Sequence, residues 1–328
     1  MRTTILFGGT NKERLVSVAS AQALHQALPE ADLWFWDVGN TVHEVRSEAL
    51  LNHSRPFEDS FKPENRGVGF AQALDKAKAE DRVLVLGLHG GTAENGELQA
   101  MCEMRGIPFT GSGSASSHLA FDKMAAKRFA AIAGVKAPAG VALEDIDAAF
   151  AQYGKLIAKP ARDGSSYGLI FVNAKQDLVA VRNAARTEDY LIEPFISGVE
   201  ATCGVLEQPD GSVFSLPPIE IVPAEGAFDY TAKYLLKSTQ EICPGRFAPE
   251  ITAQIMDQAM RSHKALSCSG YSRTDFIISE KGPIYLETNT LPGLTKASLY
   301  PKALRAQGIE FADFLQDQIV LAIKRTQK

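Results

Sequence analysis

The chain has 328 residues, 45% of them apolar, and a net charge of −5. This length suits two or three domains of about 100–200 residues each. The acidic balance offers no broad basic field, so we expect neither nucleic acid nor a membrane as a partner. We find no export signal or bilayer-spanning apolar run, and the four cysteines form no CxxC pair. We therefore predict a cytoplasmic protein with reduced thiols.

Strand and helix patterns alternate over the first hundred residues. Short apolar runs at 3–7, 31–38 and 82–89 indicate buried strands, and residues 13–28 have helical periodicity. This order predicts an α/β fold with a parallel, Rossmann-like sheet in the N-terminal domain. The polar segment 40–70 fits no pattern.

The rest of the chain divides into a mixed middle region and a strand-rich final region. The middle region shows helix, strand, glycine-rich turn, strand, helix and strand patterns at 120–133, 155–159, 164–168, 168–172, 176–185 and 190–195. In the final region, strands precede helices at 253–267 and 311–324, with a hairpin between them. We predict domains at 1–111, 112–196 and 197–328.

The predicted hairpin carries charged residues on both strands. If it is symmetric about Lys281, facing residues form the pairs Asp275–Glu287 and Arg273–Asn289. Because side chains alternate along a strand, all four project from one face. Facing carboxylates repel each other, and Mg²⁺ relieves this repulsion because it binds carboxylate and amide oxygens. An exposed hairpin with incidental charges is the alternative.

Two glycine-rich turns are candidate anion sites. Lys159 ends a strand before Gly164-Ser165-Ser166-Tyr167-Gly168, where backbone N–H groups and hydroxyls can approach phosphate. Gly8-Gly9-Thr10 leads from the first strand to a helix that begins near Glu13. There is no Walker GxxxxGK[ST] and no GxGxxG, which disfavours an NAD-dependent dehydrogenase. Taken alone, each turn also fits an ordinary polar loop. Likewise, Glu13 and Lys123 each fit an ordinary solvated helix residue.

Several short motifs occur in a fixed order along nearly the whole chain, except about residues 34–82. They are Gly8-Gly9-Thr10 with Glu13-Arg14, Leu88-His89-Gly90, Asp122-Lys123, Lys159-Pro160, Gly164 to Gly168, Ile192-Glu193, Tyr230 to Tyr234, Arg273-Thr274-Asp275, Glu287-Thr288-Asn289 and Ser298-Leu299. This series resembles the D-alanine–D-alanine ligase family of the ATP-grasp superfamily.

The resemblance implies a three-domain ATP-grasp enzyme, a homodimer, that binds ATP with two Mg²⁺ or Mn²⁺ ions. The nucleotide would lie between the central and C-terminal domains. The implied metal ligands are Asp275, Glu287 and Asn289. The implied nucleotide-binding residues are Lys123, Lys159, Ser166, Glu193, Phe195, Ile196, Glu200 and Lys233.

The implied reaction joins two D-alanine molecules through a D-alanyl phosphate, for peptidoglycan synthesis. By the resemblance, Glu13 binds the first ammonium near His89, and Ser298 and Leu299 lie near the second substrate. Arg273 and the Gly293 N–H would stabilise the oxyanion. Glu13, Ser165 and Tyr234 resemble a triad that ties a mobile loop to the site, and Tyr234 implies a dipeptide product. We expect residues 224–230 to form a lid.

Three departures from the family pattern keep alternatives open. Leu15 stands where a second acid is frequent, Pro194 replaces a lysine, and residues 93–96 read Ala-Glu-Asn-Gly rather than Gly-Glu-Asp-Gly. A ligase for other amino acids is therefore one alternative. A non-catalytic nucleotide-binding protein is another, which the intact set of charged site residues disfavours.

Overall fold

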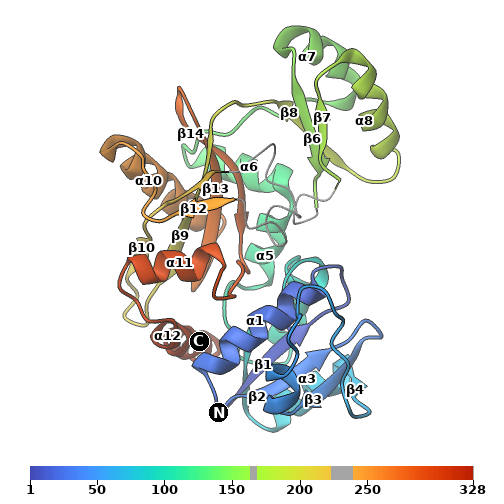
Figure 1. Ribbon diagram of the computed structural model, residues 1–328, viewed down its shortest axis with the longest axis vertical. Coiled ribbons are helices and arrows are strands. Elements are labelled where there is room, and N and C mark those ends of the chain that lie inside the picture. The colour runs from blue at the N-terminus through green and yellow to red at the C-terminus, as the bar shows by residue number, and fades with distance from the viewer. Residues whose placement is uncertain (163–167, 223–238, 328) are drawn as a thin grey trace.

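The computed structural model describes residues 1–162, 168–222 and 239–327. In this part of the chain, three separate sheets are each flanked by helices, as Figure 1 shows. The strand orders are β4-β3-β2-β1-β5, β7-β6-β8, and β12-β11-β9-β13-β14 with β10 beside β9. The mixed α/β architecture predicted from the sequence is confirmed.

The N-terminal sheet is parallel at its centre and antiparallel at one edge. Strands β1 (Arg2–Gly8), β2 (Asp32–Trp36) and β5 (Arg82–Gly87) are parallel and almost entirely buried, as their unbroken apolar runs predict. Segment 40–70 adds two antiparallel strands, β3 (Thr41–Val45) and β4 (Val68–Gly69). The helices of this unit are α1 (Arg14–Ala27), α2 (Ser47–Leu51), α3 (Phe70–Ala79) and α4 (Glu97–Glu103), with a short 3₁₀ turn, η1 (Gly91–Ala93).

The helix predicted at 120–133 is two helices, α5 (Ser114–Phe121) and α6 (Lys123–Ile132). The break falls at Asp122, whose carboxylate accepts hydrogen bonds from the backbone N–H groups of Met124 and Ala125 at 3.1 and 3.0 Å. An aspartate in this position caps a new helix, because it satisfies N–H groups that lack a partner within the helix. The single-helix prediction is therefore wrong.

A small antiparallel sheet follows, built from β6 (Leu156–Pro160), β7 (Ile170–Val172) and β8 (Tyr190–Pro194). Helices α7 (Ile146–Tyr153) and α8 (Leu178–Ala184) cover it, preceded by the turns η2 (Leu143–Asp145) and η3 (Lys175–Asp177). Their apolar faces share one core with the sheet.

The largest sheet contains β9 (Val199–Glu207), β10 (Val213–Ser215), β11 (Ile219–Val222), β12 (Gln240–Ile242), β13 (Tyr271–Ser279) and β14 (Gly282–Asn289). Helix α10 (Pro249–Ala265) packs against β14 and β9, and α11 (Leu299–Ala306) packs against β9. The final helix, α12 (Phe311–Thr326), contacts α1 and β5. It joins the N-terminal unit and this sheet in one apolar core.

The hairpin formed by β13 and β14 has the predicted register where charged residues face each other. Asp275 faces Glu287, and Arg273 faces Asn289. Beyond Asp275 the register shifts by one residue, so that Phe276 faces Tyr285 and Leu286 is the extra residue of a β-bulge. The assumed symmetry about Lys281 therefore holds only for the part of the hairpin that carries Arg273, Asp275, Glu287 and Asn289, and not for the part between the bulge and the turn.

The predicted domain ranges stay predictions, because packing crosses both boundaries. Helices α5 and α6 pack on β14, although they precede the small sheet in sequence, and α12 returns to the N-terminal unit. Within the described residues, no helix is both long enough and apolar enough to cross a membrane.

Candidate active site

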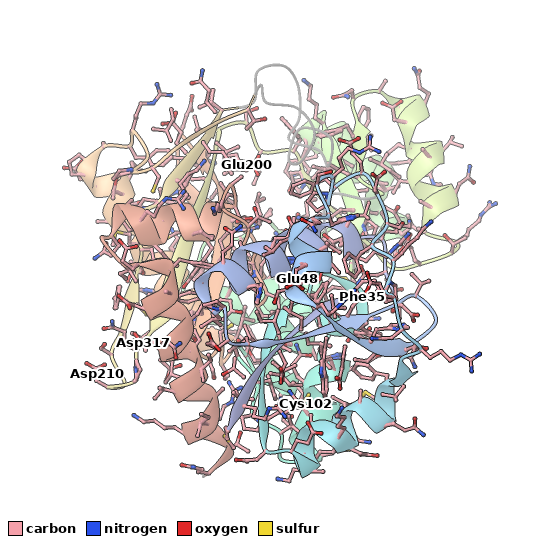
Figure 2. The ribbon with its side chains drawn as sticks, turned by 60° about the horizontal axis from the view of Figure 1, so that its bottom comes forward. Phe35, Glu48, Cys102, Glu200, Asp210 and Asp317 are labelled. Carbon is pink, nitrogen blue, oxygen red and sulfur yellow. The ribbon has the colours of Figure 1, made fainter. Side chains whose placement is uncertain are left out.

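A pocket lies where loops of the N-terminal unit meet the six-stranded sheet. Figure 2 labels one of its wall residues, Glu200, which lies near the start of β9 in the six-stranded sheet. The wall combines residues predicted for the amino acids, the metal and the nucleotide: Glu13, His89, Glu200, Arg273, Asp275, Glu287, Asn289, Gly293, Ser298 and Leu299. The structure thus brings together residues up to 286 positions apart, from Glu13 to Leu299 (299 − 13).

Asp275 is held in a fixed orientation. Arg273 donates from Nε to Oδ1 at 2.9 Å and from Nη2 to Oδ2 at 2.8 Å. The Asn289 Nδ2 donates to Oδ2 at 3.2 Å, and the Thr202 hydroxyl donates to Oδ1 at 2.6 Å. Such charge-assisted bonds are stronger than neutral ones, so this carboxylate has little freedom to turn.

Glu287 lies on the facing strand, and its Oε2 is 3.4 Å from the Lys123 Nζ. Two carboxylates and one amide therefore share one face of the hairpin, a donor set that suits Mg²⁺ or Mn²⁺. The described residues contain no cluster of three or more His, Cys, Asp or Glu side chains that could hold a metal. The fit therefore depends on the amide of Asn289, with substrate oxygens as further ligands.

The residues predicted for the nucleotide surround the end of the small sheet. Lys123 is the first residue of α6 and only 8% exposed, so the alternative of a solvated helix lysine is wrong. Lys159, near the end of β6, lies 3.6 Å from the buried Glu193 carboxylate on β8. Beyond β8, the Phe195 side chain is exposed and Ile196 is partly exposed. Cations, a buried acceptor and an open apolar ring together suit a purine triphosphate.

Two loops of the N-terminal unit are joined by Asn11, next to Glu13. The Asn11 Oδ1 accepts from the Glu13 backbone N–H at 2.7 Å, and its Nδ2 donates to the carbonyls of His89 and Gly90 at 2.8 and 2.9 Å. Gly90 has a φ of +65°, and a Cβ there would collide with the Glu13 carboxylate. Glycine is thus required for Glu13 to lie over this loop. Glu13 is buried, unlike an ordinary first-turn glutamate.

His89 is a buried neutral imidazole. Burial lowers its pKa to about 4; a bond to the Leu291 carbonyl opposes this effect and the Arg273 charge reinforces it. Its Nδ1 is 3.3 Å from that carbonyl, which can only accept, so Nδ1 carries the proton. Nε2 then accepts from the Ser20 hydroxyl at 2.8 Å. The ring position and tautomer are therefore both fixed.

Glu94 lines the same pocket, although in the sequence it stands out only as part of a departure from the family pattern. Burial, and secondly the nearby Glu13 charge, raise the pKa of its carboxyl group to about 8, while the Gly90 N–H donates to it at 3.1 Å. A neutral carboxyl, a carboxylate and a neutral imidazole together suit an ammonium group. No local sequence signal distinguishes Glu94 from a solvated loop residue.

Phe57 is a second wall residue that sequence reasoning missed. It sits in a turn closed by the Arg55–Asp59 ion pair, at 2.8 Å, within the segment that fitted no pattern. The turn is followed by Phe61, which packs on Phe7 and Phe35 of the core. The side chain reaches the pocket only through this tertiary anchoring, which no periodicity indicates.

The far end of the pocket is formed by the N-terminus of α11, where Ser298 is the residue before the first turn but its side chain makes no capping bond to the helix. Its hydroxyl accepts from the Thr295 N–H at 3.1 Å and lies 2.7 Å from the Thr295 hydroxyl. A Cβ on Gly293 would come within 2.8 Å of the Ser298 Oγ, so only glycine allows this close turn. The N–H groups of a helix N-terminus bind a carboxylate well.

Four predicted site residues, Ser165, Ser166, Lys233 and Tyr234, lie outside the described residues, as does the lid predicted at 224–230. The hydrogen-bonded triad with Glu13 and the nature of the product therefore stay predictions.

The fold and this pocket define an ATP-grasp carboxylate–amine ligase, an ATP- and magnesium-dependent enzyme. The chain matches two family models, "D-ala D-ala ligase N-terminus" over residues 2–112 and "D-ala D-ala ligase C-terminus" over residues 147–320. It belongs to the D-alanine–D-alanine ligase family, as the motif series indicated.

Individual relatives align with this chain over almost its full length. The D-alanine–D-alanine ligase of Cupriavidus necator is 39% identical over 97% of this chain and 90% of the relative. That of Halalkalibacterium halodurans is 35% identical over 99% and 100%. Among solved structures, the VanG D-Ala:D-Ser ligase from Enterococcus faecalis has a TM-score of 0.78 and 30% identity, covering 98% of this chain and 99% of that one. The Bacillus anthracis D-alanine–D-alanine ligase complexed with ATP has a TM-score of 0.73 and 26% identity, covering 100% and 98%.

Proposed function

We propose that this chain joins two D-alanine molecules at the expense of ATP and supplies D-alanyl-D-alanine for peptidoglycan. One observation carries the proposal. Asp275, Glu287 and Asn289 share one face of the hairpin, and the same pocket is lined by Glu13 and His89. The residues proposed to hold the metal and its phosphates thus lie next to those proposed to bind the amino acid.

The first half-reaction activates a carboxylate, which is otherwise a poor electrophile. The carboxylate of the first D-alanine attacks the γ-phosphorus of ATP, which gives D-alanyl phosphate and ADP. Glu13 binds the ammonium, while Lys123 and Lys159 offset charge on the phosphates. Asp275, Glu287 and Asn289 would hold Mg²⁺, two ions by the family resemblance, and the bound metal would offset negative charge on the phosphates.

The second half-reaction forms the peptide bond. The amine of the second D-alanine attacks the acyl carbonyl, the tetrahedral intermediate expels phosphate, and the proton released by the amine ends on that phosphate. The Arg273 guanidinium and the Gly293 N–H stabilise the oxyanion, and the second carboxylate binds at Ser298 beside Leu299. By the resemblance, family members that form dipeptides carry a tyrosine at the position of Tyr234. This supports a dipeptide rather than a depsipeptide product.

The nucleotide assignments complete the proposal. Glu193, Phe195 and Ile196 contact adenine, Glu200 binds the ribose, and Ser166 and Lys233 contact the phosphates. We further propose a homodimer, which follows from the family resemblance, and a cytoplasmic location, where ATP is available. Light scattering during gel filtration tests the dimer, because a mass near that of one chain would exclude it.

The experiment that tests this function is a substrate panel. The purified chain is given ATP, Mg²⁺ and each of a set of D- and L-amino acids, while phosphate release is followed and products are identified by mass. We expect D-alanine to give the highest kcat/KM and D-alanyl-D-alanine as the product. A higher value for another amino acid would identify a ligase of different specificity. Absence of ATP turnover with every amino acid would refute the ligase assignment.

A further inference from the structure

A buried cluster of charge links the small sheet to the large one, and the mechanism above does not use one of its members, Lys127. Lys127 lies on α6, one helical turn after Lys123, and is only 6% exposed. Its Nζ is 2.8 Å from the Glu193 Oε1 and donates to the Tyr285 carbonyl of β14 at 3.2 Å. Lys159 lies on the other side of Glu193, 3.6 Å from Oε2.

Glu193 has a vacant acceptor despite this neighbour. It is 2% exposed, and its Oε1 meets no described donor in good hydrogen-bond geometry, although the Lys127 ammonium forms an ion pair with it at 2.8 Å. A buried acceptor without a donor is costly, so native structures rarely leave one unless a ligand or water supplies the donor. Oxygen Oε1 is therefore poised for a donor from outside the protein.

We propose that Lys127 is a positioning residue that holds Glu193 as an ionised hydrogen-bond acceptor, and so makes the enzyme select a 6-amino purine over a 6-oxo purine. The inference rests on the proposed function, which assigns Glu193 to adenine. An ionised carboxylate only accepts, and the amino group of adenine donates to it. The 6-oxo group of hypoxanthine also only accepts, so the two oxygens repel each other.

The charge of Lys127 is needed because the site is dry. Without Lys127 the nearer cation is lost and Lys159 remains 3.6 Å from the other oxygen, so the charge of this buried carboxylate is only partly offset and uptake of a proton becomes more favourable. The neutral carboxyl would carry an O–H that donates to a 6-oxo group, and the preference would weaken. Lys159 is farther away, and in the proposed function it faces the phosphates. Burial lowers the pKa of the Lys127 ammonium to about 8 and Glu193 opposes this shift, which agrees with a closely coupled pair.

A purely architectural role for Lys127 makes a different prediction. A buried ion pair is weak support for stability, since well-packed apolar residues frequently replace one without loss. If Lys127 only joined β14 to β8, its replacement would lower thermal stability and impair both nucleotides equally. Only a role in base recognition changes the ratio of the kcat/KM values for two nucleotides whose purines differ at position 6.

The test compares kcat/KM for ATP and for inosine 5′-triphosphate, with D-alanine saturating, in the full-length wild type and in Lys127→Met. We expect the wild type to prefer ATP and the variant to lose at least about tenfold of that preference, because a hydrogen bond to a charged group is worth roughly 1.5–3 kcal/mol. The loss should fall on KM for ATP, with KM for D-alanine unchanged. Lys127→Arg should restore most of the preference.

Two further variants keep the test decisive. Lys136→Met removes a lysine that bonds the Lys281 carbonyl outside the cluster, and it should leave the ratio unchanged. If Lys127→Met does not fold, Glu193→Gln takes its place, because its amide can donate to a 6-oxo group and should also lower the ratio. If the ratio of kcat/KM for ATP to that for inosine 5′-triphosphate is unchanged in Lys127→Met, or in Glu193→Gln where that variant replaces it, this inference alone is overturned. A wild type without ATP turnover overturns the proposed function itself.

Discussion

The two sides of the pocket are built by different means. On the six-stranded sheet, four pocket residues project from paired strands, namely Arg273, Asp275, Glu287 and Asn289. Hydrogen bonds to Asp275 fix Arg273 and Asn289, and an ion pair joins Glu287 to Lys123. In the N-terminal unit, the pocket residues lie on loops and turns that tertiary contacts hold in place, such as those made by Asn11. We propose that this difference reflects a division of labour, in which the strands fix the reacting phosphate and the loops recognise the amino acid. Substitutions on the sheet should therefore change kcat, whereas those on the loops should change KM for the amino acid.

The largest effect is expected at Arg273. Replacing it by lysine removes a bidentate partner of Asp275 and displaces a donor to the oxyanion. We expect kcat to fall by about 100- to 1,000-fold, the usual loss for an oxyanion donor, with little change in KM for ATP. Steady-state kinetics measures both. A large rise in KM for D-alanine with kcat intact would break the proposed division of labour.

Glu13 should show the opposite signature. In Glu13→Gln the ammonium of the first D-alanine loses a charged partner, at a cost of about 1.5–3 kcal/mol, or roughly 10- to 150-fold in affinity. We expect that loss in the KM of the first amino-acid site, with ATP binding unaffected. Separate titration of the two amino-acid sites measures it. If only the second site weakened, Glu13 would have been assigned to the wrong substrate.

Ser20 tests whether the neutral His89 ring must be held in place. Ser20→Ala removes the hydroxyl that donates to Nε2 and leaves a buried acceptor unpaired. A neutral hydrogen bond contributes about 0.5–1.5 kcal/mol, so KM for D-alanine should rise by roughly 2- to 12-fold. The ratio of KM for D-alanine in the variant to that in the wild type should be the same at pH 6 and pH 8, because the pKa of His89, at about 4, lies below both values. A ratio that differs between the two pH values would indicate a titrating imidazole.

A further effect is on stability rather than on activity and involves Glu94. Its pKa is raised from the ordinary 4.5 to about 8, so the unfolded chain releases this proton at lower pH than the folded one. The stabilising contribution of the neutral carboxyl is therefore complete below about pH 4.5 and lost as the pH rises to about 8. Glu94→Gln, which stays neutral, should gain Tm relative to the wild type across that window. Thermal denaturation from pH 4.5 to 8.5 measures this, and a constant difference would contradict the assigned shift.

The sheet side of the pocket could be predicted from sequence because strand geometry is local. Alternation at period two places Asp275 and Arg273 on one face, and a short turn brings Glu287 and Asn289 opposite them. The bulge at Leu286 could not be predicted, because an extra strand residue needs no distinctive side chain here. The break at Asp122 was predictable in principle, since aspartate is a strong helix-capping residue.

The loop side depends on contacts that sequence spacing does not encode. Phe57 reaches the pocket because Phe61 is anchored in a core of residues far away in the chain. Glu94 owes its raised pKa to burial beside Glu13, 81 positions earlier (94 − 13). Lys127 did have a signal, one turn after Lys123 on the same helix, but only the folded chain shows that it meets Glu193.

The proposed activity requires that Asp275, Glu287 and Asn289 hold the cation that presents ATP to the amino acid. The most direct measurement is Mn²⁺ binding, followed by electron paramagnetic resonance, in the presence of a non-hydrolysable ATP analogue. For Glu287→Gln we predict weaker Mn²⁺ binding and a turnover reduced by more than about 100-fold, because loss of even an outer partner of a metal ligand typically costs 10- to 100-fold. Wild-type Mn²⁺ affinity together with wild-type turnover in Glu287→Gln would contradict the account.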